Sequence, residues 1–511
     1  MRRGAVTIML ITDHGCSLLQ SYLRPPVDIG KQGWYSLLRH CGMGRTVALL
    51  SLDIRQSTSS VQESPVRCEV LVVGGGPGGS TIAALLAERG RHVVLVEKER
   101  HPRFHIGESL LPLNLPLFER LGIKDAIEQI SIRKYGAEFV SPYHGRAITY
   151  NFANAWDKTI PYSYQVRRSE FDHVLLKNAA AKGAEVVEGV RVTEVAFPAG
   201  GGAEIRANDG DGRECRWHAA FVVDASGRDT LLAGQLGIKR RNRRHNSAAM
   251  FGHFTGARRL AGKAEGNISI FWFDHGWFWF IPLADGATSI GVVGAPEFFK
   301  SRKTDLASFF MDTIAMCPEI ADRLKNARLV SDVTATGNYS YSAERMAGRN
   351  FILVGDAFAF IDPVFSTGVY LAMTTAFLGA DAVEACLREP QRAERILERY
   401  EAAARRGLAT FTWYIYRIRS PVFRNIFMSP RNRFRIEEAV LSLLAGDVFG
   451  RSPIGWRLVA FKLIYYAMSA TYLVHRIKDR LMRRRGNEIA AAAGYAGEFH
   501  DSSALHDREQ K

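Results

Sequence analysis

Cysteine is sparse in this sequence of 511 residues. The six cysteines stand at positions 16, 41, 68, 215, 317 and 386, and the nearest two are 25 residues apart. No CxxC pair and no Cys/His cluster is present, which argues against a zinc site and against a dense disulfide framework. We therefore expect no metal, and a protein of the reducing cytoplasm.

A long uninterrupted apolar run is also missing. The most apolar late stretch, residues 463–474, has 12 residues between Lys462 and His475, whereas a spanning helix needs about 20. Near the N-terminus the apolar run is brief and is interrupted by Asp13 and His14, unlike a signal peptide. The sequence thus predicts no membrane span and no secretion.

Acidic residues are too few to balance the basic ones. Asp and Glu number 52 against 67 Lys and Arg, a net charge of +15. Most of the excess lies between Arg405 and Arg485, where 17 basic residues face 4 acidic ones. Because the charge is regional, we do not expect a nucleic-acid-binding protein.

The composition that remains is that of a globular protein, with 47% apolar and 23% charged residues. Residues 1–66 show no periodicity and are expected to form a poorly ordered extension. Residues 67–389 predict the main module, 390–485 a basic helical region, and 486–511 a flexible tail.

The strongest local pattern is a βαβ unit. A Val-rich run from Cys68 predicts a buried parallel strand, STIAALLAERG a helix ending before Gly90, and RHVVLVEKE a second strand. Between the first strand and the helix stands Gly74-x-Gly76-x-x-Gly79, with Gly78 inside it. These glycines permit a tight turn, a close pyrophosphate and close helix packing.

Two residues at the end of the second strand extend this site. Glu97 follows Gly76 by 21 residues, at the position where an acid accepts hydrogen bonds from a ribose, and Lys98 comes next. Segments of alternating polarity between the buried strands predict antiparallel sheet. The fold class is therefore α/β: a discontinuous Rossmann-like dinucleotide-binding domain, an inserted antiparallel β-rich substrate domain and a helical C-terminal region.

Two further motifs resemble FAD-dependent monooxygenases. The segment 223–227 (VDASG), with Asp224, and the segment 355–357, with Gly355 and Asp356, each end a buried strand. In that class the Gly-Asp aspartate contacts the ribityl and pyrophosphate part of FAD. Arg168, in QVRRSEFD, matches the arginine of the class near the flavin.

Four segments narrow the resemblance to flavin-dependent halogenases. HPRFHIGESLLP (101–112), with Arg103, Glu108 and Ser109, resembles the loop of that family beside the isoalloxazine. The family patterns W-x-W-x-I-P and F-x-x-P-x-x-S-x-G match residues 277–282 and 360–368. Lys134 falls where the family keeps its catalytic lysine.

The resemblance implies a mechanism and its cofactors. FADH2 and O2 give a flavin C4a-hydroperoxide, which oxidises chloride or bromide to hypohalous acid. Halide is expected at Thr367 and Gly368, with Ser366 and Lys134 as the catalytic residues; the lysine passes the halogen to an electron-rich ring. A wall between flavin and substrate is expected from Trp277, Trp279, Ile281, Pro282 and Phe365.

One position departs from the tryptophan halogenases, which carry Glu directly before Ser-Thr-Gly. This sequence has Phe365 there and resembles the branch that acts on phenols and pyrroles. The implied partners are an aromatic substrate (phenol, pyrrole or indole), free or tethered to an acyl carrier protein, and a separate flavin reductase, because no second glycine motif is present.

Several interpretations stay open. A reductase of the geranylgeranyl type, an aromatic hydroxylase and a non-catalytic flavoprotein share much of the pattern. The basic region fits a solvated helical face, a docking surface for an acidic carrier protein, or peripheral contact with anionic lipid through residues 475–485.

Overall fold

The computed structural model describes residues 10–12, 15–17, 65–242, 245–337, 340–450 and 452–492. The chain divides into two compact units, Met1–Glu63 and Ser64–Lys511. In the first unit, β1 (Leu10–Thr12) pairs antiparallel with β2 (Gly15–Ser17). The remainder of the expected N-terminal extension lies outside the described residues.

The first sheet of the second unit has the strand order β10-β11-β12-β3-β4-β9, with β22 beside β12 and β21 beside β22. Its pairs are parallel in the centre (β12–β3, β3–β4, β4–β9, β12–β22) and antiparallel along β10–β11–β12. The strands are β3 (Val66–Val73), β4 (Val93–Glu97), β9 (Glu185–Glu188), β10 (Val190–Ala196), β11 (Ala203–Asp209), β12 (Glu214–Asp224), β21 (Ala347–Gly348) and β22 (Phe351–Leu353).

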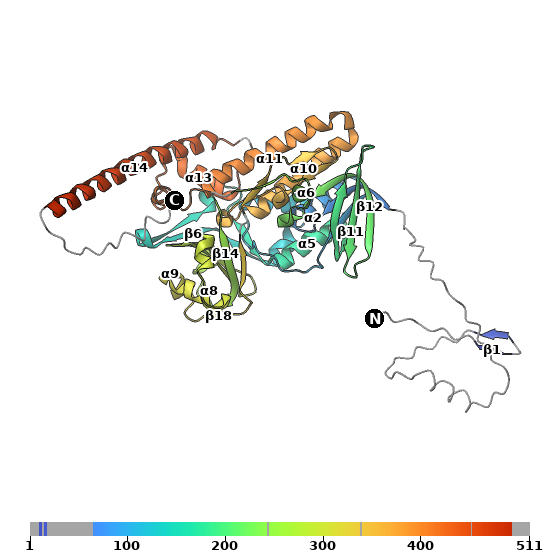
Figure 1. Ribbon diagram of the computed structural model, residues 1–511, viewed down its shortest axis with the longest axis horizontal. Coiled ribbons are helices and arrows are strands. Elements are labelled where there is room, and N and C mark those ends of the chain that lie inside the picture. Colours follow the sequence, from blue (N-terminus) through green and yellow to red (C-terminus); the bar gives the residue numbers. More distant parts are fainter. Residues whose placement is uncertain are drawn as a thin grey trace, which may run out of the picture. The chain divides into compact units, whose positions relative to one another are not determined.

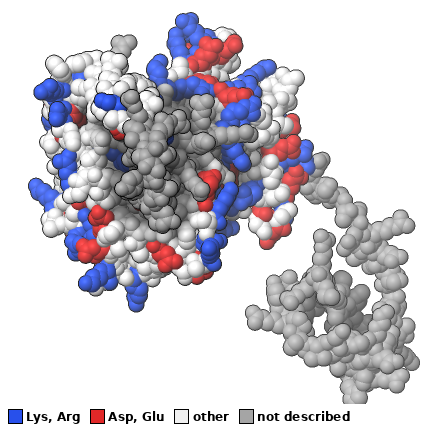
Figure 2. All heavy atoms as spheres, turned by 60° about the vertical axis from the view of Figure 1, so that its left-hand side comes forward, with Lys and Arg blue, Asp and Glu red and all other residues white. Residues whose placement is uncertain are grey.

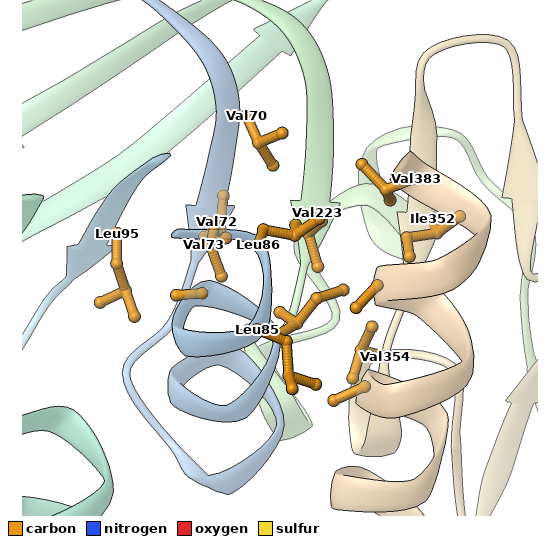
Figure 3. Packing of buried hydrophobic residues seen from close by; sticks show 14 of the residues in the cluster. Val70, Val72, Val73, Leu85, Leu86, Leu95, Val223, Ile352, Val354 and Val383 are labelled. Atoms are coloured by element: carbon orange, nitrogen blue, oxygen red, sulfur yellow. The ribbon is translucent and has the colours of Figure 1, made fainter. Parts of the chain in front are cut away.

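Helices α2 (Pro77–Glu88), α5 (Arg168–Ala181) and α10 (Gly368–Arg388) pack with this sheet, α2 contacting both of the others. Figure 3 shows the packing: valines of β3 and Val223 of β12 face Leu85 and Leu86 of α2, with Val383 of α10 beside them. Each such buried side chain contributes about 1.5–3 kcal/mol. The predicted βαβ unit and the Rossmann-like fold are confirmed.

The second sheet has the order β18-β14-β17-β16-β15-β6-β7, with β19 beside β14. It forms the inserted β-rich part that the alternating segments predicted. Its strands are β6 (Gly136–Ser141), β7 (Arg146–Asn151), β14 (Ala248–Thr255), β15 (Ile268–Phe273), β16 (Gly276–Pro282), β17 (Thr288–Gly294), β18 (Arg328–Leu329) and β19 (Thr334–Gly337).

Smaller elements complete the unit. Two minor sheets pair β5 (Ser131–Lys134) with β8 (Ser163–Val166), and β13 (Lys239–Arg241) with β20 (Tyr341–Ala343) and β23 (Ala359–Phe360). The short helices are α3 (Leu115–Leu121), α4 (Lys124–Gln129), α6 (Leu231–Gln235), α7 (Pro296–Lys300), α8 (Leu306–Ala315) and α9 (Pro318–Arg323).

The C-terminal region is helical, as predicted. It contains α11 (Ala393–Ile415), α12 (Pro421–Phe427), α13 (Ile436–Ala445) and α14 (Gly455–Ala492), seen in orange and red in Figure 1. The ring of Phe427 lies 4.7 Å from that of Phe139 on β6, so this region shares a core with the second sheet. Helix α14 continues to Ala492, so the tail predicted from residue 486 is helical at its start; the rest of that tail lies outside the described residues.

Two helices in the described ranges are long and apolar enough to cross a membrane by length and composition alone. One is α10, whose apolar window is 72% buried inside the protein. The other is Gly455–Met482 of α14, of which 11% is buried. The sequence analysis counted as apolar only the 12 residues between Lys462 and His475, whereas the apolar part of α14, Gly455–Met482, includes both.

Candidate functional site

A cavity of about 560 Å³ is lined by residues from both large sheets. At one end it reaches the turn before α2 and the ends of β4 and β10; at the other it reaches β14, β16 and the start of α10. Of the predicted site residues, the lining includes Gly74, Gly76, Gly78, Glu97, Lys98, Arg103, Glu108, Ser109, Arg168, Trp277, Trp279, Ile281, Asp356, Ser366 and Gly368.

The geometry of the turn before α2 explains why its positions are glycines. Gly74 has φ +101°, and a Cβ there would lie 2.4 Å from the Ala225 carbonyl oxygen. A Cβ on Gly79 would lie 1.9 Å from the Gly74 carbonyl oxygen, so Gly79 closes the turn instead of lining the cavity. A Cβ on Gly76 would make only one ordinary contact, at 3.7 Å from Arg103 Nη2. The N-terminus of α2 therefore meets the cavity with accessible backbone, which suits a pyrophosphate.

Glu97, which ends β4, hydrogen-bonds to this turn. Glu97 is buried, and its Oε2 accepts a hydrogen bond of 2.6 Å from the Gly75 amide. Lys98, directly after it, donates to Asp229 at 2.6 Å. Both line the cavity beside Val190 and Val192, so an adenosine and its ribose would meet them at this end.

Two arginines share one buried carboxylate. Arg168 donates to both carboxylate oxygens of Asp172, at 2.8 and 3.0 Å, and to the Ile106 carbonyl oxygen at 3.0 Å. Arg103 donates to Asp172 at 3.1 Å. Burial opposes ionisation of Asp172, yet the charges and hydrogen bonds of the two arginines keep its pKa below the usual range. Arg168 therefore holds the 101–112 loop in place.

Asp172 was missed by the sequence analysis. Its spacing of four residues from Arg168, on one turn of α5, was the available signal.

The two aspartates taken from the monooxygenase motifs differ in their surroundings. Asp356 faces the cavity, and burial raises its pKa to about 6. Asp224 does not line the cavity, since its carboxylate accepts from the Ser226 and Leu232 amides at 2.9 and 2.8 Å. The Asp224 carboxylate caps the turn and the start of α6, and its expected contact with the cofactor stays a prediction.

Other predicted residues shape the cavity without lining it. Gly355 has φ +60° and packs closely against α10. A Cβ on Gly355 would lie 2.8 Å from the Cβ of Ala372. Pro282 ends β16 on the face opposite to Trp277, because successive strand residues alternate sides. Thr367 is 1% exposed and directly precedes α10.

Glu108, in the 101–112 loop, forms a buried pair with a histidine of the second sheet. Glu108 is 1% exposed, and His253 Nε2 lies 3.0 Å from its Oε1. His253 belongs to β14, 145 residues away in the chain, and its ring meets Phe104 edge-on at 6.0 Å. Because this pairing is purely tertiary, the sequence held no signal for His253.

The side chain of Lys134 ends β5 and is 2% exposed. Its Nζ donates to Ser109 Oγ at 2.9 Å and to the Leu110 carbonyl oxygen at 3.0 Å, and it lies 5.4 Å from the Phe152 ring centre. Burial lowers the pKa of Lys134 to about 7. The amine is therefore close to half neutral near neutral pH.

The tryptophans of β16 form one wall of the large cavity. Trp277, Trp279 and Ile281 share a strand face and line it, whereas Phe278 and Phe280 point into a separate cluster with α8. The Trp279 ring covers Gly291 on β17, where a Cβ would lie 2.1 Å from it, and Trp279 Nε1 donates to Ser289 Oγ at 3.1 Å.

The start of α10 closes the same end of the cavity. Ser366 adopts φ +58°, the left-handed region, and α10 begins at Gly368. The first amides of a helix have no intrahelical acceptor. The turn of Ser366 therefore brings the amides of Thr367 and Gly368 to the helix start, and Gly368 is open to the cavity.

A second, small cavity of about 20 Å³ contains Lys134. It shares only Ile268 and Ser366 with the large one. Its remaining walls are Leu111, Ala137, Phe139, Phe152, Ile270, Val364, Phe365 and Leu444. Phe365 thus lines the small cavity with Lys134 and not the large cavity. Phe152 and Leu444 were missed by the sequence analysis, since nothing local marks them. In the described part of the chain, no group of His, Cys, Asp and Glu is arranged to hold a metal ion.

Comparisons with known proteins agree with this geometry. The family model described as FAD binding domain matches residues 67–411. The chain is 29% identical over 407 residues to the 1H-pyrrole-2-carbonyl-[peptidyl-carrier protein] chlorinase of Pseudomonas fluorescens, covering 75% of this chain and 89% of that protein. It is 36% identical over 332 residues to tryptophan 2-halogenase of Chondromyces crocatus, covering 63% of this chain and 62% of that protein, which is less than two thirds of its length.

Among solved structures, the myxobacterial chondrochloren halogenase CndH, described as a variant of FAD-dependent halogenases, superposes with a TM-score of 0.66 at 32% identity. The match covers 79% of this chain and 97% of that one.

Proposed function

Since this chain belongs to the family of flavin-dependent halogenases, we propose that it places chlorine or bromine on an electron-rich aromatic ring. The observation that carries the proposal is the position of Lys134, buried in a small cavity that meets the large one at Ile268 and Ser366. An amine placed there can receive an oxidant without contact between the substrate and the cofactor.

The large cavity fits FAD. Gly76 leaves room for a phosphate at the start of α2, Glu97 and Lys98 stand at the adenosine end, and Trp277 and Trp279 are flat walls at the other end. Reduced FAD bound there would supply the two electrons with which O2 becomes able to oxidise a halide. In the balanced reaction, FADH2, O2, a halide ion, a proton and an aromatic C–H give FAD, a carbon–halogen bond and two molecules of water.

The residues of the chain control where the oxidised halogen goes. Amides of Thr367 and Gly368 suit a halide ion beside the cofactor. Ser366 lines both cavities, so the oxidised halogen would pass beside it on its way to Lys134. Trp277 and Trp279 keep an organic ring away from the cofactor, which separates halogenation from direct hydroxylation.

Lys134 serves as the acceptor and donor of halogen. With its pKa lowered to about 7, a large fraction of the amine is neutral and can attack hypohalous acid at nitrogen, while the ammonium fraction can donate a hydrogen bond to the same oxidant. Ser109 and the Leu110 carbonyl hold the amine in the cavity.

The substrate we propose is a phenol, pyrrole or indole whose own hydroxyl or nitrogen activates the ring, because Phe365 offers no carboxylate to do so. The similarity to a chlorinase whose name specifies a carrier-bound pyrrole supports delivery by an acyl carrier protein. A separate flavin reductase would supply FADH2.

Anaerobic reduction of the flavin, followed by O2, bromide and a panel of phenols and pyrroles, free and carrier-bound, tests the proposal. The expected result is a product with the bromine isotope pattern. Lys134→Ala should lose this product by more than about a hundredfold while still binding FAD. Equal product from the variant would disprove the role of Lys134, and an oxygenated product formed without halide would identify a hydroxylase.

A further inference from the structure

The first half of helix α14 has one face on the protein and one face exposed, and from Ala470 to Met482 nearly all of its residues are exposed. Leu458 and Phe461 are buried, and the Tyr465 ring packs 5.4 Å from Trp413 of α11. On the opposite face, Trp456 and Leu463 are 55% and 65% exposed. The inner contacts therefore fix the direction in which the outer face points.

Ile464, Met468, Tyr472 and Met482 are exposed on other sides of the helix, but eight other exposed apolar residues of α14 form one continuous stripe. They follow at spacings of three and four, which places them on one side of a helix. The stripe consists of Trp456, Val459, Leu463, Tyr466, Ala470, Leu473, Ile477 and Leu481. Its large members are 49–65% exposed. The 28 residues of Gly455–Met482 extend over about 42 Å, and α14 (red) leaves the rest of the unit in Figure 1. A contiguous apolar surface of this kind marks an interaction site.

The charges around the stripe have one sign. Residues 455–485 contain eight Lys and Arg, and Asp479 is their sole acidic residue. In Figure 2, with the side that bears α14 turned forward, both basic and acidic side chains stand around the margin of the described surface, with uncharged areas between them. Trp456, Tyr466 and Tyr472 add amphipathic rings, which favour the boundary between water and lipid.

We propose that the outer stripe of α14 lies in the headgroup region of an anionic lipid bilayer, with the flanking Lys and Arg against lipid phosphates. This inference is independent of the proposed halogenation. An interfacial helix combines an apolar face, basic residues beside it and amphipathic aromatic rings, and α14 has all three, with Trp456 near its start.

The structure disfavours insertion across the bilayer. Although Gly455–Met482 as a whole is long and apolar enough, its uncharged run 463–474 would extend about 18 Å, short of a hydrocarbon core of about 30 Å. In addition, Leu458 and Phe461 are held in the protein core, so this end of the helix cannot enter lipid without unpacking.

Two protein partners could also cover the stripe of α14: a second copy of the chain or an acidic carrier protein. Charge and size argue against them. A second copy of the chain would bring two arrays of like charge together, since Asp479 alone could pair with the other array. An acidic carrier protein would match the charge, but a small partner would cover only part of a stripe of this length. Both remain outcomes of the test.

The test is co-sedimentation of the full-length protein with vesicles. Binding should be at least about tenfold greater on phosphatidylcholine mixed with phosphatidylglycerol than on phosphatidylcholine alone, and should fall with added salt. The triple variant Leu463→Glu, Leu473→Glu and Ile477→Glu should abolish it. Met311→Glu with Val330→Glu is the matched control, because both side chains are similarly exposed but lie outside α14; it should bind as the parent does.

Three results would overturn the inference. They are no sedimentation with either vesicle; sedimentation that the α14 variant leaves unchanged; and a dimer, or a complex with purified acyl carrier protein, that forms without lipid and is lost in the α14 variant while vesicles are not bound. Circular dichroism and flavin absorbance of each variant establish that it is folded.

Discussion

Lys134 combines burial with an ionisable amine, and the combination costs stability. Its only polar contacts that the structure gives are to a hydroxyl and a carbonyl oxygen, and burial lowers its pKa from 10.5 to about 7. Below pH 7 the folded protein holds a buried cation. Above it the folded amine is neutral while the unfolded amine stays charged until about pH 10.5, so this residue's contribution to stability improves as the pH rises.

We therefore expect Lys134→Met to be more stable than the parent by about 2–4 kcal/mol at slightly acidic pH, while losing halogenation. The advantage should shrink by up to about 1.4 kcal/mol per pH unit above pH 7. Denaturant unfolding of both proteins across this pH range measures it. A variant that is less stable throughout, or whose advantage grows with pH, would contradict the role of burial.

Position 291 on β17 is a glycine because the Trp279 ring lies directly over it. A Cβ at this position would overlap the Trp279 ring at 2.1 Å. Gly291→Ala should cost about 1–3 kcal/mol of unfolding free energy, because the ring must move, and should disturb the wall beside the cofactor. The same substitution should cost little when combined with Trp279→Ala. Gly234→Ala, where nothing lies within 4 Å, serves as the control. Equal costs in both backgrounds would show that the two residues are not coupled.

At the residue scale, the sequence predicted groups whose roles are local or are set by a motif. The glycine turn is of this kind, because its constraints arise within six residues. The partner of Glu108 could not be predicted, since His253 reaches it only through the fold. Asp224 lies outside the cavity lining, where its carboxylate accepts from two backbone amides, so its expected contact with the cofactor stays a prediction.

Helix α13 contributes one wall of the small cavity that contains Lys134. Its residue Leu444 is one wall of a space of about 20 Å³, which holds a water-sized molecule and no aromatic ring. If the proposed aromatic substrate reaches Lys134, a wall of this cavity has to move to admit its ring.

Leu444→Ala should shift the preference of the enzyme toward larger aromatic rings, at about 2–5 kcal/mol of stability. Leu443→Ala on the same helix is buried to 1% exposure but lies outside the cavity lining, so it should cost similar stability without the shift. Competition between a one-ring and a two-ring substrate measures the preference. The same shift in both variants would assign it to general loosening of the helix.

Elements of the fold were predicted where hydrophobic periodicity is strong, as in β3, α2 and β22. For β16 the sequence offered a match to a family pattern, and its two faces could be assigned only once α8 and the cavity were placed on opposite sides. For α14, the sequence showed an apolar stretch and a basic stretch, and the structure joins them in one helix.

In the whole molecule, the C-terminal helices complete the core of the second sheet. The Tyr150 hydroxyl donates to the Phe427 carbonyl oxygen at 2.5 Å, and Phe411, Tyr414 and Phe423 are buried in the same cluster as Trp272. The boundary expected at residue 389 therefore separates no independent core, and residues 64–511 form one compact unit.

We expect a chain that ends after Glu389 to be insoluble or to lack cooperative unfolding, because it would expose that cluster to water. A chain that ends after Met482 should fold and bind FAD as the parent does. Expression, flavin absorbance and a thermal unfolding curve distinguish the two. A folded, flavin-binding protein from the shorter chain would refute the shared core.

The buried amine has a practical corollary for engineering. Selection for heat tolerance alone would reward any apolar replacement of Lys134, so libraries screened only for soluble, yellow, thermotolerant protein would accumulate inactive members. Every round of such a campaign would have to score halogenated product directly.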